Sequence, residues 1–81
     1  MKIRVMLFAV AKQIAGAPEI ELEFAAGPTV AEVRQALIQL CPDLAEVMAC
    51  CMLAVNNEYA SMDQVIGDDC EVGLIPPVSG G

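Results

Sequence analysis

The order in which the hydrophobic period changes along this chain constrains its fold more than any other feature. In residues 2–8 every second residue, at positions 3, 5 and 7, is a branched apolar one, which is the period of a strand with one face on a core. The other face of this strand is partly apolar too, because it carries Met6 and Phe8 beside two basic residues. Residues 19–24 alternate without exception, because Glu19, Glu21 and Glu23 stand between apolar neighbours. We therefore expect two strands, of which the second lies at a sheet edge with a solvent-exposed acidic face.

One amphipathic helix follows these strands. Thr29 and Glu32 have the spacing of a capping box, in which each side chain accepts a hydrogen bond from the other residue's backbone. Apolar residues then recur at spacings of three and four as far as Leu40, and Pro42 ends the helix. Asp43 is expected to cap a short second helical turn.

The remaining segments predict short strands. Residues 52–55 form an apolar run that ends at Asn56-Asn57, and residues 59–60 begin a return strand. After a turn at 67–69, residues 70–75 alternate as a last strand. One helix crossing a mixed sheet indicates an α+β domain, and the β-grasp, or ubiquitin-like, roll has this order. In that roll the first and last strands lie side by side and parallel.

The charge of the chain disfavours nucleic acid as a partner. Eleven acidic residues against four basic ones give a formal net charge of -7, which would repel a phosphate backbone. The bases lie in the first part of the chain, at Lys2, Arg4, Lys12 and Arg34. A contact surface formed by the second half would therefore fit a basic partner.

The apolar residues do not predict a membrane protein. No apolar run approaches the roughly 20 residues that a membrane span requires. The N-terminus runs directly into the first alternating segment, without the apolar stretch and cleavage site of a signal peptide. We expect a cytosolic chain of 81 residues that makes no membrane contact, with a domain at residues 1–75 and an extended tail at 76–81.

Side chains suited to conventional catalysis are scarce. The chain has no histidine and one tyrosine, Tyr59, while Ser61 and Ser79 have no obvious base. An enzyme that performs acid–base catalysis with its own side chains is therefore not expected. Acidic residues at 68, 69 and 71 lack the spacing of a calcium loop, and we interpret them as solvated.

The sulfur-containing residues form no recognisable motif. Cys50-Cys51 lacks the CxxC spacing of redox and zinc sites, and no second motif accompanies it. We interpret the cysteines as reduced thiols, buried or uninvolved in function, whose role the sequence leaves undefined: Cys41, Cys50, Cys51 and Cys70. Methionines in apolar segments are expected to fill gaps in the core: Met6, Met48, Met52 and Met62.

The C-terminal segment is the most informative part of the sequence. It reads Pro76-Pro77-Val78-Ser79-Gly80-Gly81, so that two prolines stiffen its start and two glycines leave its end without side chains. Extended at about 3.3 Å per residue, six residues would reach about 20 Å from the domain and enter a narrow cleft. A carboxylate is a poor electrophile, so Gly81 would need activation by ATP to an acyl adenylate in a partner enzyme.

Several segments together resemble a known family. These are Leu7-Phe8-Ala9 followed by Gly16, the helix entry Thr29-Val30-Ala31-Glu32, the run Ala54-Val55-Asn56 and, above all, the segment from Ile75 to Gly81. Over essentially the whole chain they resemble the small subunits of molybdopterin synthase, which are ubiquitin-like sulfur carriers of molybdenum-cofactor biosynthesis.

The resemblance implies a sulfur-transfer function for the C-terminus. A ubiquitin-activating-type adenylyltransferase would adenylate Gly81, and sulfur from a sulfurtransferase would convert it to a thiocarboxylate (1-thioglycine). The tail, kept slim by Gly80, would enter the large synthase subunit, whose side chains catalyse formation of molybdopterin from cyclic pyranopterin monophosphate. No cofactor would be bound permanently, since the activating enzyme consumes ATP and Gly81 carries AMP only transiently.

The resemblance also implies an assembly and a contact surface. Family members form heterotetramers of two small and two large subunits, so this chain would be the sulfur-donating subunit of the enzyme. Contacts near the root of the tail would be hydrophobic, and the residues expected to make them are Phe8, Leu74, Pro76, Pro77, Val78 and Ser79.

Three other functions stay open from the residues. A sulfur carrier for the thiamine thiazole or for tRNA thiolation would share the activation chemistry. A ubiquitin-like modifier would instead use the same adenylate to form an isopeptide bond with a lysine. A β-grasp interaction module with an inert tail would tolerate removal of Gly80 and Gly81.

Overall fold

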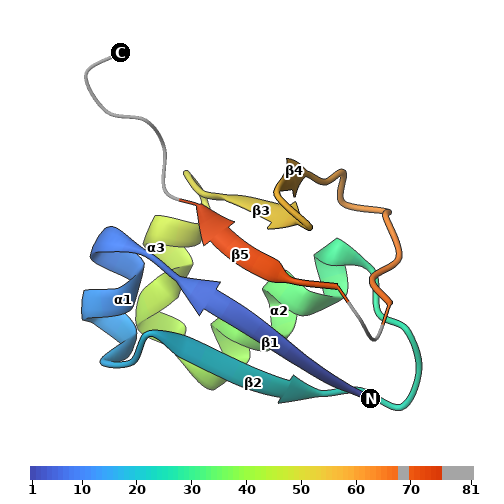
Figure 1. Ribbon diagram of the computed structural model, residues 1–81. Helices are drawn as coiled ribbons and strands as arrows, with labels where there is room; N and C mark the ends of the chain where they lie inside the picture. The colour runs from blue at the N-terminus through green and yellow to red at the C-terminus, as the bar shows by residue number, and fades with distance from the viewer. Residues whose placement is uncertain (68–69, 76–81) are drawn as a thin grey trace.

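The computed structural model describes residues 1–67 and 70–75, in which strands and helices are arranged as two layers (Figure 1). In chain order the elements are β1 (Lys2–Leu7), α1 (Ala9–Ala15), β2 (Glu19–Glu23), α2 (Val30–Leu40), the 3-10 helix η1 (Pro42–Leu44), α3 (Ala45–Met48), β3 (Met52–Val55), β4 (Glu58–Tyr59) and β5 (Val72–Ile75). No helix among the described residues has the length and apolar character needed to cross a bilayer.

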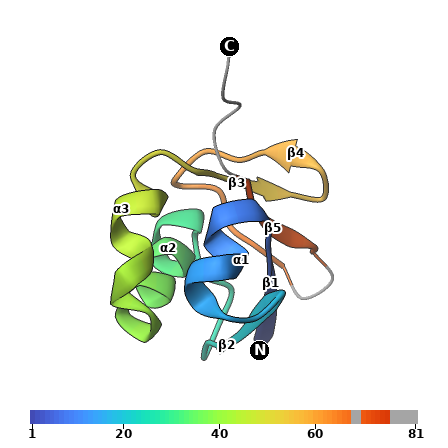
Figure 2. The ribbon, with the colours of Figure 1, turned by 90° about the vertical axis from the view of Figure 1, so that its left-hand side faces the viewer.

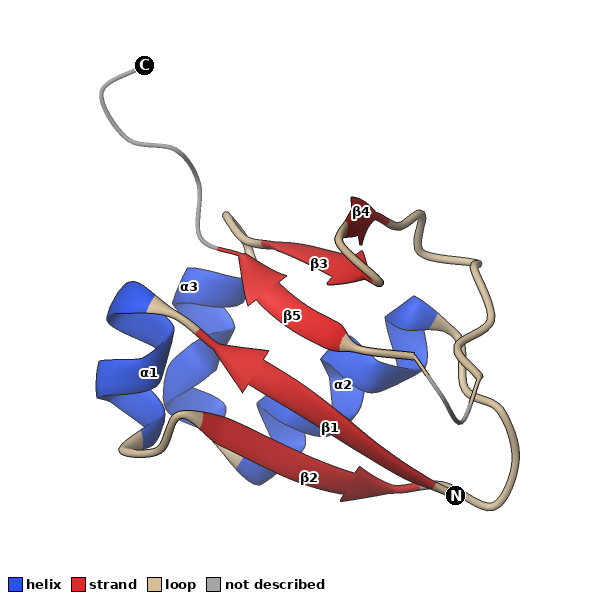
Figure 3. Ribbon diagram, viewed as in Figure 1, coloured by secondary structure: helices blue, strands red, loops and turns tan. Residues whose placement is uncertain are grey.

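The strands form one mixed sheet in the order β2-β1-β5-β3-β4. The first and last strands, β1 and β5, are parallel neighbours, while the other adjacent pairs are antiparallel. The helices lie against one face of the sheet, as the side view shows (Figure 2) and as the colouring by secondary structure makes plain in the front view (Figure 3). The opposite face is called the outer face below. The predictions of a β-grasp fold, of β2 at the sheet edge and of parallel first and last strands are confirmed.

The core lies between the sheet and the helices. In β1 exposed and buried residues alternate, and the buried ones face the helices. They pack with buried residues of α2, of the later strands and of the segment around η1 and α3. The largest fully buried side chains are Ile3, Leu37, Leu44, Met48, Ile66, Leu74, Val5, Val30, Val33, Val72 and Pro28.

The predicted capping box forms at the start of α2. Thr29 Oγ1 accepts a hydrogen bond from the Glu32 backbone N–H at 3.2 Å, and Glu32 Oε1 accepts one from the Thr29 N–H at 2.9 Å. The helix ends at Leu40, directly before the short element that Pro42 begins. Asp43 makes no capping bond there, because it lies inside η1, whose N-cap is Cys41. The prediction that Asp43 caps this turn is therefore wrong.

Helix α1 was not predicted from the sequence. Its N-cap residue, Phe8, provides no side-chain hydrogen bond, and Ala11 is its only buried residue. The helix therefore lacks both a polar cap and an apolar stripe, the two signals from which helices are recognised. Gly16 ends it in the left-handed conformation, with φ 75° and a backbone hydrogen bond to the carbonyl of Lys12.

The prediction that four methionines fill the core is right for only one of them. Met48 is fully buried and fills the core as expected. Met6, Met52 and Met62 are 37%, 49% and 50% exposed, so the prediction that they fill the core is wrong. Met6 and Met52 occupy exposed positions in the strand patterns of β1 and β3, where the alternate residues face the helices.

Candidate functional site

The last described strand, from which the C-terminal segment continues in sequence, lies at the centre of the sheet. This strand, β5, is the root of that segment, lies between β1 and β3 and ends at Ile75. Because β5 runs parallel to β1, with Leu74 opposite Leu7, it ends where β1 is followed by Phe8. On the other side Ile75 is opposite Met52, the first residue of β3. The structure thus brings Phe8, Met52 and Ile75, from three segments distant in sequence, to one end of the sheet.

The predicted chemical residues themselves lie outside the described part of the chain. Gly80 and Gly81 belong to the segment 76–81, as do four of the predicted partner contacts: Pro76, Pro77, Val78 and Ser79. Their roles, and the division of the chain at residue 75, remain predictions. The described residues instead define the surface from which this segment starts.

On the outer face of the sheet, the residues around the end of β5 are apolar. Gly73 on β5 is paired with Met6 on β1 and with Ala54 on β3, and Ala54 is paired with Tyr59 on β4. We call this set, with the residues at the end of the sheet, the outer apolar surface: Met6, Phe8, Met52, Ala54, Tyr59, Gly73 and Ile75. Phe8 is 45% exposed and Tyr59 62% exposed, so large apolar side chains face solvent here. Large apolar side chains exposed near one another in this way are typical of an interaction site.

Phe8 is therefore in the position predicted for a partner contact, but Leu74 is not. The Leu74 side chain is 0% exposed and belongs to the core. Alternate residues of a strand face opposite sides of a sheet, so its neighbour Ile75 is the residue that lies on the outer face. The burial of Leu74 contradicts the prediction of a direct partner contact through its side chain, and Ile75 is the residue of this strand end that is available on the outer face.

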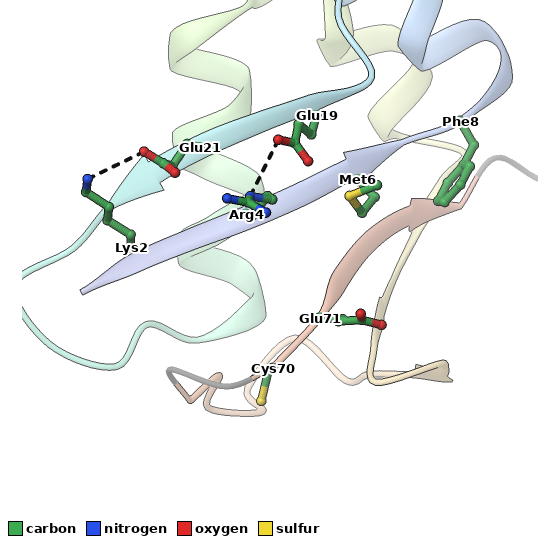
Figure 4. A pocket seen from close by; sticks show the side chains of 8 residues that line it. All are labelled: Lys2, Arg4, Met6, Phe8, Glu19, Glu21, Cys70 and Glu71. Atoms are coloured by element: carbon green, nitrogen blue, oxygen red, sulfur yellow. Dashed lines mark ion pairs between the residues drawn. The ribbon is translucent and has the colours of Figure 1, made fainter.

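The other half of the outer face carries charges that neutralise one another. Lys2 Nζ lies 3.8 Å from Glu21 Oε1, and Arg4 Nε lies 3.5 Å from Glu19 Oε1. Both pairs line a pocket of about 740 Å³ together with Met6, Phe8, Cys70 and Glu71. Figure 4 shows the lining side chains and the two ion pairs. Exposed pairs of this kind contribute little to stability. Their consequence is that two of the four bases are already engaged with acids of this chain.

The chain path between β1 and α1 holds Phe8 at this surface. Phe8 is extended, with φ -129°, and Ala9 then adopts a left-handed conformation with φ 52°. A residue with a Cβ is disfavoured in this region by about 1 kcal/mol. This local cost falls next to the root of the C-terminal segment, where backbone strain is often kept for function.

The four cysteines are free thiols in different surroundings. Cys50 is exposed and Cys51 is only 4% exposed. Burial raises the pKa of the Cys51 thiol, the neighbouring Cys50 raises it further, and the Arg34 guanidinium opposes the shift. Arg34 is held nearby because its Nη2 donates a hydrogen bond to the Met48 carbonyl at 2.8 Å. Among the residues described, no three potential ligands gather as a metal site.

We expect alkylation to distinguish the two adjacent cysteines. Cys50 should react with iodoacetamide at least about tenfold faster than Cys51, because the reactive species is the thiolate and Cys51 is both buried and raised in pKa. The pKa of the Cys51 thiol in the folded chain lies above its ordinary value of 9.0. The buried neutral thiol therefore makes its full contribution to stability below pH 9.0, and this contribution is lost as the pH rises through the folded-state pKa. Fragment-ion mass spectrometry of the labelled peptide measures the two rates. Equal rates in the folded chain would contradict the burial of Cys51, and equal rates in denaturant serve as the control.

Comparison with known proteins identifies relatives along the full length. The ThiS family matches residues 5–81. A molybdopterin synthase sulfur carrier subunit from Arabidopsis thaliana is 36% identical over 81 residues, which cover 100% of this chain and 84% of the relative. One from Chlamydomonas reinhardtii is 35% identical over 83 residues, which cover 100% of both chains.

Solved structures share the fold. SAMP1 from Haloferax volcanii superimposes with a TM-score of 0.86 at 26% identity and covers 100% of both chains. A Pyrococcus furiosus protein assigned as molybdopterin converting factor subunit 1 gives 0.87 at 30% identity, over 96% of this chain and 99% of that one. A chain in the Helicobacter pylori complex of subunits 1 and 2 of molybdopterin-converting factor gives 0.72 at 23% identity, over 100% of both. By these full-length matches in sequence and fold, the chain belongs to the ThiS family and is a relative of molybdopterin synthase sulfur carrier subunits.

Proposed function

We propose that this chain is the sulfur carrier subunit of a molybdopterin synthase and works in the cytosol. The observation that carries the proposal is its relationship, at 36% and 35% identity over the whole chain, to proteins with that name. The exit of β5 from the centre of the sheet, beside the outer apolar surface, supports it. A partner that binds this surface would receive the segment 76–81 directly.

The proposed chemistry takes place on the carboxylate of Gly81. An adenylyltransferase of the ubiquitin-activating type consumes ATP and leaves AMP on Gly81 as an acyl adenylate. A persulfide on a sulfurtransferase then displaces AMP, because AMP is a far better leaving group than an oxide ion. The acyl disulfide so formed is cleaved by a thiol, which releases the thiocarboxylate and leaves the donor and the thiol joined as a disulfide. The resulting thiocarboxylate donates its sulfur to cyclic pyranopterin monophosphate. This chain would thus contribute the reactive sulfur to a sulfurtransferase reaction, without catalytic side chains of its own.

The proposed partner is the large subunit of the synthase, in an assembly of two small and two large chains. A structural relative is found in a complex of subunits 1 and 2 of the molybdopterin-converting factor. In this chain Phe8, Met52 and Ile75 surround the root of the tail and offer the apolar contact that such an interface needs. The large subunit supplies the catalytic groups and excludes water from the transfer site.

Intact-mass analysis tests the chemistry. After incubation with ATP, the activating enzyme, a persulfide donor and a thiol reductant, we expect one sulfur to replace one oxygen at Gly81. A variant with all four cysteines changed to Ser or Ala is the matched control, since it should acquire the same sulfur. A sulfur located on a cysteine, together with loss of transfer in a folded cysteine-free variant, would refute the carboxylate mechanism.

One observation favours a second candidate, a ubiquitin-like protein modifier. The fold superimposes on SAMP1 with a TM-score of 0.86, and a SAMP1 from Methanosarcina acetivorans is named a small archaeal modifier protein. A modifier would share the adenylate but form an isopeptide bond with a lysine. Mass analysis of the chain purified from its own cells distinguishes the two outcomes, because a thiocarboxylate and a lysine adduct differ in mass. A carrier for thiazole or tRNA thiolation would form the thiocarboxylate but fail to produce molybdopterin with a large subunit.

A further inference from the structure

We infer that Gly73 is a positioning residue for partner docking: by lacking a side chain larger than a methyl group, it lets the edge of the Phe8 ring approach the central strand β5 and so shapes the outer apolar surface. The inference rests on the proposed function in one respect, because the partner used to test it is the large subunit. The partner chemistry it requires is an apolar surface complementary to Phe8, Met6 and Ile75.

The geometry around Gly73 carries the inference. Gly73 is paired with Met6 on one side and Ala54 on the other, so it occupies the middle of the outer face. A Cβ placed on it would lie 3.4 Å from Phe8 Cε2 and 3.6 Å from Ile75 Cδ1. The end of the Phe8 ring thus rests where a larger side chain at position 73 would stand. Figure 4 shows the Phe8 side chain directed from the end of β1 toward β5.

The backbone does not account for this glycine. Gly16 is the only described glycine with positive φ, so Gly73 has a conformation that other residues adopt. A glycine inside a strand weakens it and often marks a close approach of another group. The close group here is the ring of Phe8. Phe8 remains 45% exposed, so the ring comes close to position 73 and still presents surface to a partner.

Two features that lie near each other in the fold therefore help to set the position of the Phe8 ring. Ala9 adopts its disfavoured left-handed conformation directly after Phe8, and Gly73 leaves space beneath the ring. Neither is required by the hydrophobic core, since Ala9 is exposed and Gly73 contributes no side chain. Aromatic side chains held in a fixed geometry are the residues that most often dominate the affinity of an interface.

Substitutions of graded size at position 73 test this role. Ala adds one methyl at ordinary contact distance from Phe8, so Gly73→Ala should change affinity for the large subunit by less than about threefold. Gly73→Val adds two further carbons that displace the ring, and we expect affinity to fall by roughly tenfold or more. In a Phe8→Ala background the same Gly73→Val change should cost less than about twofold, because a residue acting through Phe8 has no effect once the ring is gone.

The matched control is Gly67→Val. Gly67 also lacks positive φ, and a Cβ placed on it would lie 3.8 Å from the Cys70 sulfur, at the end of β5 opposite Ile75. Its affinity for the large subunit should equal that of the unsubstituted chain. Thermal melts of every variant show whether a loss of affinity reflects unfolding. All binding is measured with the unmodified carboxylate form, so the result does not depend on whether a thiocarboxylate is made.

A second measurement tests the geometry without any partner. The Hα protons of Gly73 should show a ring-current shift in the nuclear magnetic resonance spectrum of the free chain, and Phe8→Leu should remove it. An unchanged Gly73 shift in Phe8→Leu would overturn the inference, as would an equal affinity loss from Gly73→Val with and without Phe8. If the unsubstituted chain did not bind the large subunit, the proposed function would fail and the docking role of Gly73 with it. The ring-current result would still show whether the packing of Phe8 on Gly73 exists.

Discussion

Deletion of Gly81 is expected to abolish molybdopterin formation while leaving the fold and its thermal stability unchanged. The reacting group of the proposed mechanism is the terminal carboxylate, so the truncated chain ends on Gly80, one residue, or about 3.3 Å, short of the transfer site. Near-attack geometry tolerates far smaller errors than this. The core is unaffected, because its buried residues lie between Ile3 and Leu74. The measurements are product formation with the large subunit, and circular dichroism during heating.

The matched control for this deletion is an extension by one alanine. The extended chain keeps Gly81 but moves the carboxylate outward by the same distance, about 3.3 Å. Both variants should bind the large subunit through the outer apolar surface and both should fail in transfer. Normal molybdopterin formation by the truncated chain would refute a mechanism on the Gly81 carboxylate and would favour an interaction module with an inert tail.

Local signals in the sequence were sufficient for much of the fold. The capping box of Thr29 and Glu32 located the start of α2, because both partners of its hydrogen bonds lie within one helical turn. Asn56 and Asn57 marked the turn after β3, and both adopt positive φ, of 52° and 68°, which asparagine tolerates better than most residues. In each case the physical cause of the structure is contained in a few consecutive residues.

The predictions were wrong or missing where the structure of a segment is determined by residues far from it in the sequence. Helix α1 buries only Ala11, so its sequence shows no apolar stripe from which a helix could be predicted. Its formation depends on packing against the segment around η1. Alternation shows that neighbouring strand residues face opposite sides, but it does not say which side is the core when both are apolar. Leu74 and Ile75 are such a pair, as are Met52 and Leu53. The glutamates of β2 resolved this question for that strand alone.

The same limit applies to the candidate site. The tail and its terminal glycines can be recognised in the sequence, because the chemistry proposed for them follows from the residue types alone. Phe8 was predicted through the family resemblance, but the approach of its ring to position 73 joins segments that the sheet brings together. Long-range contacts of this kind depend on strand order and register, which the sequence of one chain does not show.

Leu74→Ala is expected to destabilise the fold by about 2–5 kcal/mol, the usual cost of deleting a buried leucine and leaving a cavity. Leu74 is 0% exposed in the central strand, opposite both Leu7 and Leu53, so the neighbouring strands restrict collapse of the cavity. Small domains have total stabilities of about 5–15 kcal/mol, and this single change removes a large share. Urea unfolding with an unchanged m-value would measure the loss.

Ile75→Ala is the matched control for Leu74→Ala, because it removes atoms from the next residue of the same strand. Ile75 is half-buried at the end of β5, so we expect a smaller loss of stability, about 1 kcal/mol. The order should be reversed for binding: among folded molecules, Leu74→Ala should keep its affinity for the large subunit and Ile75→Ala should lose affinity. A stable Leu74→Ala chain with weakened binding would contradict the assignment of Leu74 to the core. It would restore the direct partner contact that the sequence had suggested.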